Sequence, residues 1–178
     1  MASIKLQGDT SGELTISAPA VAGTNTLTLP ASTGTVLTDT APKVGNVLQV
    51  VQGEFSGSNS TTSTSMVSTS LNASITPTSS SSKILVLVSG AAANNTLNAV
   101  AFLTIYRGAT NLAGTSFTFH ANPVSGLNNW QSVNMVYLDT PSTTSSTTYT
   151  VYFKSSSGTS YLGTGANTNT ITLMEVAG

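Results

Sequence analysis

The chain has 178 residues, a length that suits one β-sandwich-sized domain or a small domain with an arm. Only 6% of the residues are charged, against about 25% in an average soluble domain, and Ser and Thr together make up about a third of the chain. A net charge of -1 excludes a nucleic-acid binder with a basic surface, and the lack of cysteine excludes disulfides, thiolate metal sites and cysteine nucleophiles. This composition disfavours an enzyme.

The hydrophobic residues indicate a folded β-protein and not a disordered chain. They make up 39% of the sequence, and Val, Ile and Thr, which favour strands, are frequent. No apolar run approaches the roughly 18 residues of a membrane-spanning helix. The N-terminal residues lack the apolar stretch of a signal peptide. We therefore expect neither membrane insertion nor export by the ordinary secretory route.

Residues 1–40 are typical of an arm made of short strands. Ile4 and Leu6 alternate with polar residues, as do Leu14 and Ile16, and a further short strand is expected at residues 27–29. So few apolar side chains bury too little surface to stabilise the arm alone. We therefore expect the arm to gain order from a partner. Residues 41–45 are interpreted as a linker.

Residues 46–178 have longer strands and are interpreted as one head domain. Residues 84–88 form an unbroken apolar run, which predicts a strand covered on both faces. No segment shows helical periodicity, so under a tenth of the chain should be helical. The prediction is an all-β fold, in which the short-stranded arm is followed by an antiparallel β-sandwich of jelly-roll type. The expected head strands are 47–55, 67–75, 84–88, 100–106, 116–120, 132–138, 149–154 and 171–176.

Several segments resemble the fibre proteins of tailed bacteriophages, especially those of aquatic phages such as cyanophages. Two arm segments, Gly12-Glu13-Leu14-Thr15-Ile16-Ser17-Ala18-Pro19 and Asn25-Thr26-Leu27-Thr28-Leu29-Pro30, are similar to the N-terminal attachment segments of these fibres. The remainder is similar to the β-sandwich heads found at fibre C-termini. The matching head segments are Ser82-Lys83-Ile84-Leu85-Val86, Ile105-Tyr106-Arg107-Gly108, Leu138-Asp139-Thr140-Pro141, Tyr149-Thr150-Val151-Tyr152-Phe153-Lys154 and Ile171-Thr172-Leu173-Met174-Glu175-Val176.

This resemblance implies a homotrimeric structural protein of the virion, assembled in the host cytoplasm. Residues 1–40 would attach it to other virion proteins, and residues 46–178 would form the displayed head. We expect the strands at 84–88 and 171–176 to lie near the subunit contacts or in the core. Because no long shaft separates arm and head, both a tail fibre and a fibre or cement protein on the capsid fit the sequence.

A second interpretation is a module that binds carbohydrate or a host receptor through the same head. Trp130, Tyr152 and Tyr161 are the candidate contact residues, because an exposed aromatic ring stacks on a sugar ring. The simpler interpretation of Trp130 is a partly buried residue of the sandwich or of a subunit contact.

The remaining polar residues predict no catalytic, cofactor-binding or metal-binding site. His120 could bind a metal only together with its copies on a three-fold axis, and an exposed or hydrogen-bonded histidine is the simpler interpretation. Asp139, which precedes Thr140-Pro141, is predicted to form a turn. The chain has six acidic residues and no Gly-x-Ser-x-Gly motif, so paired catalytic carboxylates and a Ser-His-Asp triad are disfavoured.

Overall fold

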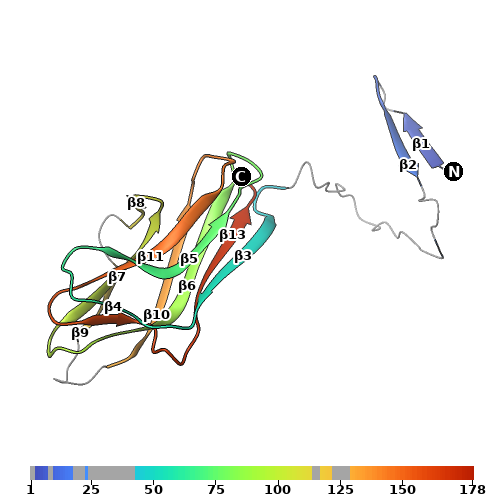
Figure 1. Cartoon of the computed structure of the whole chain (residues 1–178). Helices are drawn as coiled ribbons and strands as arrows, with labels where there is room; N and C mark the ends of the chain where they lie inside the picture. The colour runs from blue at the N-terminus through green and yellow to red at the C-terminus, as the bar shows by residue number, and fades with distance from the viewer. Residues whose placement is uncertain (1–2, 8–9, 18–22, 24–42, 114–116, 122–128) are drawn as a thin grey trace. The chain divides into compact units, whose positions relative to one another are not determined.

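The computed structural model describes residues 3–7, 10–17, 23, 43–113, 117–121 and 129–178 (Figure 1). The chain divides into two compact units, residues 1–36 and residues 37–178. Every regular element of the described residues is a strand, and none of them forms a helix that could cross a membrane. The strand predicted at residues 27–29 lies outside the described residues.

The first unit contains an antiparallel hairpin of two strands, β1 (Ser3–Gln7) and β2 (Glu13–Ser17). Gly12, between the strands, has a φ of 89°, a conformation that glycine adopts at little cost. The two strands therefore pair with each other, and the dependence of the arm on a partner stays a prediction.

The second unit is a sandwich of a six-stranded and a five-stranded sheet. All of its strand pairs are antiparallel. The six-stranded sheet contains β3 (Val47–Phe55), β4 (Asn59–Thr61), β6 (Lys83–Asn94), β10 (Gln131–Asp139), β12 (Ser160–Leu162) and β13 (Asn169–Val176). The five-stranded sheet contains β5 (Val67–Ile75), β7 (Val100–Arg107), β8 (Thr110–Asn111), β9 (Phe117–Ala121) and β11 (Thr147–Ser155).

The strand order is that of a jelly roll. In the six-stranded sheet β6 lies between β10 on one side and β13 with β12 on the other, and β3 and β4 form the far edge. In the five-stranded sheet β11 lies between β5 and β7, and β8 and β9 pair with β7. If β3 with β4, and β12 with β13, count as one strand each, successive strands largely alternate between the sheets in the double Greek-key pattern. The predicted all-β, jelly-roll-type sandwich is thereby confirmed.

The core lies between the two sheets and follows the period-two alternation of the sequence. Ile84, Val86 and Val88 point inward from β6, and Val151 and Phe153 point inward from β11. All five are at most 3% exposed. On the opposite side of β6 the intervening leucines are only partly covered, although the apolar run predicted a strand covered on both faces.

Gly90 makes room for a buried side chain that joins three strands of the six-stranded sheet. Asn169 on β13 is fully buried, and its Oδ1 accepts a hydrogen bond from the amide of Ala91 at 3.0 Å. Its Nδ2 donates to the carbonyl of Phe55 on β3 at 3.1 Å. A Cβ at position 90 would collide with the Asn169 side chain, so glycine permits this link between β6, β13 and β3.

Candidate functional site

The N-terminal hairpin has one apolar and one polar face. Ile4 lies opposite Ile16, and Leu6 lies opposite Leu14, so the four side chains share one face. Their exposed fractions are 64%, 47%, 52% and 60%, respectively. The hairpin therefore presents a row of aliphatic side chains that the described residues of this chain leave uncovered.

The opposite face of the hairpin carries its polar contacts. The Lys5 ammonium lies 2.8 Å from a Glu13 carboxylate oxygen, and the Thr15 hydroxyl donates to the same carboxylate at 3.0 Å. Both partners of the ion pair are exposed, so it contributes little stability. A two-stranded hairpin without a covering layer is marginally stable in water. Covering its apolar face would therefore stabilise both the hairpin and the contact.

Two of the three predicted aromatic contact residues lie together on the head. Tyr161 on β12 is directly opposite Ala93 on β6, and Trp130 extends the register of β10 to the other side of Ala93. The rings of Trp130 and Tyr161 are 6.1 Å apart between centroids and tilted by 56°. Ala93, which lies between them in the register, is only 4% exposed.

The third residue, Tyr152, is part of the other sheet and joins no cluster with the first two. Its ring stacks on that of Tyr106 with a centroid distance of 3.9 Å and an interplanar angle of 22°. One row along, the Lys154 ammonium lies 5.1 Å from the centroid of the Phe102 ring. The three candidate contact residues therefore do not form one aromatic cluster, because alternation along a strand does not reveal which sheet the strand joins.

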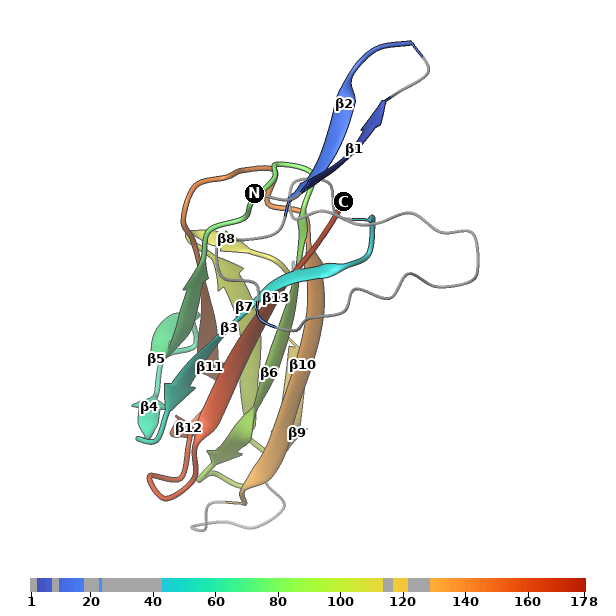
Figure 2. The ribbon, with the colours of Figure 1, turned by 90° about the vertical axis from the view of Figure 1, so that its right-hand side faces the viewer.

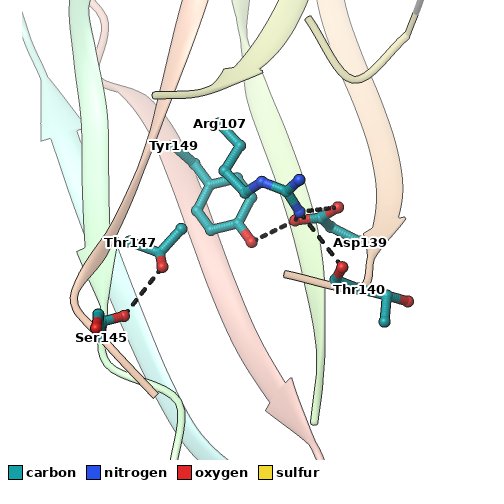
Figure 3. A network of polar contacts seen from close by, with 6 residues as sticks. All are labelled: Arg107, Asp139, Thr140, Ser145, Thr147 and Tyr149. Carbon is teal, nitrogen blue, oxygen red and sulfur yellow. Dashed lines mark hydrogen bonds and ion pairs between the residues drawn. The ribbon is translucent and has the colours of Figure 1, made fainter. Parts of the chain in front are cut away.

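A buried polar cluster links the two sheets at Asp139, the last residue of β10. Arg107 at the end of β7 donates through Nη1 to both carboxylate oxygens, at 2.9 and 2.8 Å, and to the carbonyl of Thr140 at 3.4 Å. Tyr149 on β11 donates its hydroxyl to Asp139 at 2.7 Å (Figure 3). Burial raises the pKa of Tyr149, and the Asp139 carboxylate raises it further. The prediction of Asp139 as a turn-former is corrected: its carboxylate binds across the sandwich.

This cluster is suited to holding the sheets together and not to chemistry on a substrate. Tyr149 is fully buried, and the Asp139 carboxylate is occupied by the tyrosine hydroxyl and the arginine. Among the described residues no group of three or more His, Cys, Asp or Glu side chains could hold a metal ion. β9 includes His120, whose side chain lies outside the described part of the structure.

Glu175 on β13 is a second buried acid, and it is held by hydrogen bonds. Its carboxylate accepts from the Gln49 side-chain amide at 2.6 Å and from the amide and hydroxyl of Thr78, both at 2.7 Å. Burial alone would raise the pKa of Glu175, but these hydrogen bonds outweigh burial and hold the pKa below its usual value. Glu175 thus links β3 and β13 to the segment that follows β5.

The strand order and these surfaces together define a jelly-roll head with a separate amphipathic hairpin. No protein-family model matches the chain, and no curated protein matches it. Among solved structures, it is similar to the VP2 subviral particle of infectious bursal disease virus, with 12% identity and a TM-score of 0.45 over 86% of this chain and 37% of that chain.

Structures of two strains of the same virus give similar values. The Gx strain matches with 12% identity and a TM-score of 0.40 over 94% of this chain and 43% of that chain. The Gt strain matches with 14% identity and a TM-score of 0.38 over 97% of this chain and 46% of that chain. The chain thus spans less than half the length of these viral proteins. The fold assignment rests on the strand order described above.

Proposed function

We propose that this chain is a structural protein of a bacteriophage virion. In this proposal it forms a short homotrimeric fibre or a cement protein, mounted on the tail or the capsid. The N-terminal hairpin attaches it to another virion protein, and the jelly-roll head is displayed. Three features support the proposal: the resemblance of its segments to phage fibres, the low content of ionisable and catalytic residues, and a head fold that viral coat domains commonly use.

The observation that carries the proposal is the apolar face of the hairpin. Each of its four aliphatic side chains exposes about half of its surface, so covering the face would contribute about 1 kcal/mol per residue, or about 4 kcal/mol in all. One arm would therefore bind weakly. Three arms attached to one trimer would bind much more tightly, because the second and third contacts form within the same complex.

The proposed attachment can be tested by changing only the apolar face. Ile4→Thr with Ile16→Thr removes apolar surface but keeps β-branched side chains, so strand propensity is preserved. A matched control, Gln7→Thr with Ser17→Thr, introduces the same residue type on the polar face. We expect the first variant to be largely absent from purified virions by quantitative mass spectrometry, and the control to be present at wild-type copy number. Wild-type incorporation of both variants would contradict the proposed attachment face.

A second candidate function is binding of a host-surface glycan, and the Trp130–Tyr161 pair favours it. The two tilted rings lie on either side of Ala93, and this arrangement could accept the apolar face of a sugar. A glycan array probed with the full chain tests this function. Signals that disappear with Trp130→Ala and persist with Tyr152→Ala would support it, because Tyr152 is an aromatic residue of the other sheet. An array without any signal would count against it.

A further inference from the structure

The exposed aliphatic residues of the head are concentrated at one end of the six-stranded sheet. Among the described head residues, six large hydrophobic side chains are exposed: Val44, Val47, Val50, Leu97, Val136 and Leu138. All of them except Leu97 belong to the end where the chain enters the head. Large exposed apolar patches are rare on monomeric soluble proteins and commonly mark interaction sites.

The register of the strands assembles these residues into one continuous surface. Leu138 on β10 lies opposite Leu85 on β6, Leu85 lies opposite Met174 on β13, and Met174 lies opposite Val50 on β3. This row crosses all four strands, which lie side by side in Figure 2. The neighbouring rows add four more aliphatic residues on the same side of the sheet. We call this whole surface of the head the apolar face, which is distinct from the aliphatic face of the hairpin: Val47, Val50, Leu85, Leu87, Val136, Leu138, Met174 and Val176.

The apolar face gives way to polar residues along the strands, first at Thr172 and Gln52, which lie in the same row as Val136 and Leu87. Two residues further along, the corresponding outward row consists of Asn134, Ser89, Thr170 and Glu54. Of the charged residues on β3, β6, β10 and β13, Asp139 and Glu175 are buried, Lys83 lies at the margin beside Val176, and Glu54 lies in the polar row. The face is therefore bordered by polar groups and is nearly free of charge, as the core of a protein–protein interface is.

We propose that the apolar face is covered by a second copy of this chain. The unbroken apolar run of residues 84–88 is the pattern of a strand covered on both faces, yet Leu85 and Leu87 remain partly exposed in the single chain. A self-contact would complete this coverage. It would also meet little like-charge repulsion, because Lys83 is the one outward-facing charge at this end of β3, β6, β10 and β13.

The size of the face fits the centre of such an interface. Four strands about 4.8 Å apart and rows that span about 14 Å along the strands give an area of roughly 270 Å², which also includes the positions of Thr172, Gln52 and Lys83. This is about a third of the roughly 800 Å² that each partner contributes to a standard interface. The polar row and the adjoining loops would supply the rim, as in interfaces with an apolar centre and a polar margin.

The face also lies where the arm leaves the head. The amide of Gly45 donates to the carbonyl of Ala177 at 2.8 Å, and the amide of Ala177 donates to the carbonyl of Asn46 at 2.8 Å. The chain thus enters the head beside the end of β13. Copies that meet at the apolar face would bring the starting points of their arms together. This consequence rests on the proposed function, whereas the self-contact depends only on the surface of the head.

Sedimentation velocity of the full chain over a range of concentrations tests the self-contact. We expect wild type to sediment as an oligomer, and Val136→Ser with Leu138→Ser to shift toward monomer, with association weakened more than about tenfold. Leu97→Ser is the matched control, since Leu97 is 47% exposed and lies outside the face, and it should sediment like wild type. Val50→Ser changes the same face on β3. It provides an independent test if the two substitutions in β10 prevent folding. A monomeric wild type, or variants of the face that associate like wild type, would overturn the proposal.

The lack of cysteine in the chain allows a second test that identifies what covers the face. Leu138→Cys should react with a maleimide more slowly as protein concentration rises, whereas Leu97→Cys should react at a constant rate. Protection of Leu138→Cys that does not depend on concentration would show that the chain covers the face itself, and would overturn the proposal. Absence of the wild-type chain from purified virions, with intact self-association, would instead count against the proposed function alone.

Discussion

Asp139 carries much of the polar connection between the two sheets of a head that contains few charges. Its carboxylate accepts one hydrogen bond from the hydroxyl of Tyr149 and two from Nη1 of Arg107. Asp139 is only 6% exposed. A carboxylate in this position satisfies two donors that would otherwise lie in a poorly solvated region. The cluster thus fixes the end of the edge strand β10 against β7 and β11.

We therefore predict that Asp139→Ala destabilises the head by about 2–4 kcal/mol, because it leaves a buried hydroxyl and a half-buried guanidinium without their partner. Tyr149→Phe should cost less, about 1–2 kcal/mol, because it removes one bond and leaves the ion pair intact. Chemical denaturation of both variants measures the difference. An Asp139→Ala head within about 0.5 kcal/mol of wild type would contradict this role.

Glu175 should make the stability of the head depend on acidity. Its pKa is held below the unfolded value of about 4.3, so the folded state binds protons less readily than the unfolded state. The stabilisation is therefore complete above about pH 4.3 and is lost as the pH falls through the lower pKa of the folded state.

The melting temperature of wild type should accordingly fall as the pH decreases below about 4.3. Glu175→Gln should melt lower than wild type at pH 7 and should lose part of this acid dependence. Glu54→Gln is the matched control, because it makes the same substitution at an exposed position. Identical acid profiles for wild type and Glu175→Gln would show that Glu175 does not contribute.

At the level of elements, the hairpin and the sandwich depend on different sources of stability. The strands of the sandwich bury alternate side chains in a shared core, whereas the hairpin has no second layer among the described residues. We expect hydrogen exchange of the free full chain to show rapid exchange of the β1 and β2 amides and slow exchange of β6 and β13. Slow exchange of the hairpin in the free chain would indicate that its apolar face is already covered.

The long strands were predictable from sequence because their side chains alternate between core and surface. Residues 67–75, 149–154 and 171–176 all lie in strands, as predicted. The short strands β4, β8 and β12 were missed, because segments of two or three residues are too short to show periodicity and owe their order to pairing with neighbours. Asn59–Thr61, for example, is a strand because it pairs with β12.

The candidate sites were less predictable, since they depend on contacts between residues far apart in sequence. Arg107 and Tyr149 are opposite each other in the register of β7 and β11, and both meet Asp139 from the other sheet. No spacing within the sequence reveals such a meeting. For the same reason Trp130 joins Tyr161, and Tyr152 joins Tyr106 instead.

For the whole molecule, we propose that the arm provides attachment and that the head provides folding and self-association. The head contains the core cluster, the cluster around Asp139 and the apolar face, and the arm contains a separate apolar surface. Each unit should therefore keep its own property when the other is altered.

Deletion of residues 1–40 separates the proposed roles of arm and head, with two readouts on the same protein. We predict that the truncated head keeps the melting transition and the oligomeric state of the full chain, and that it is no longer incorporated into virions. A truncated head that unfolds or dissociates to monomers would show that the arm belongs to the core of the head. Truncated protein present on virions at wild-type copy number would show that the attachment surface lies in the head and would contradict a role of the arm in attachment.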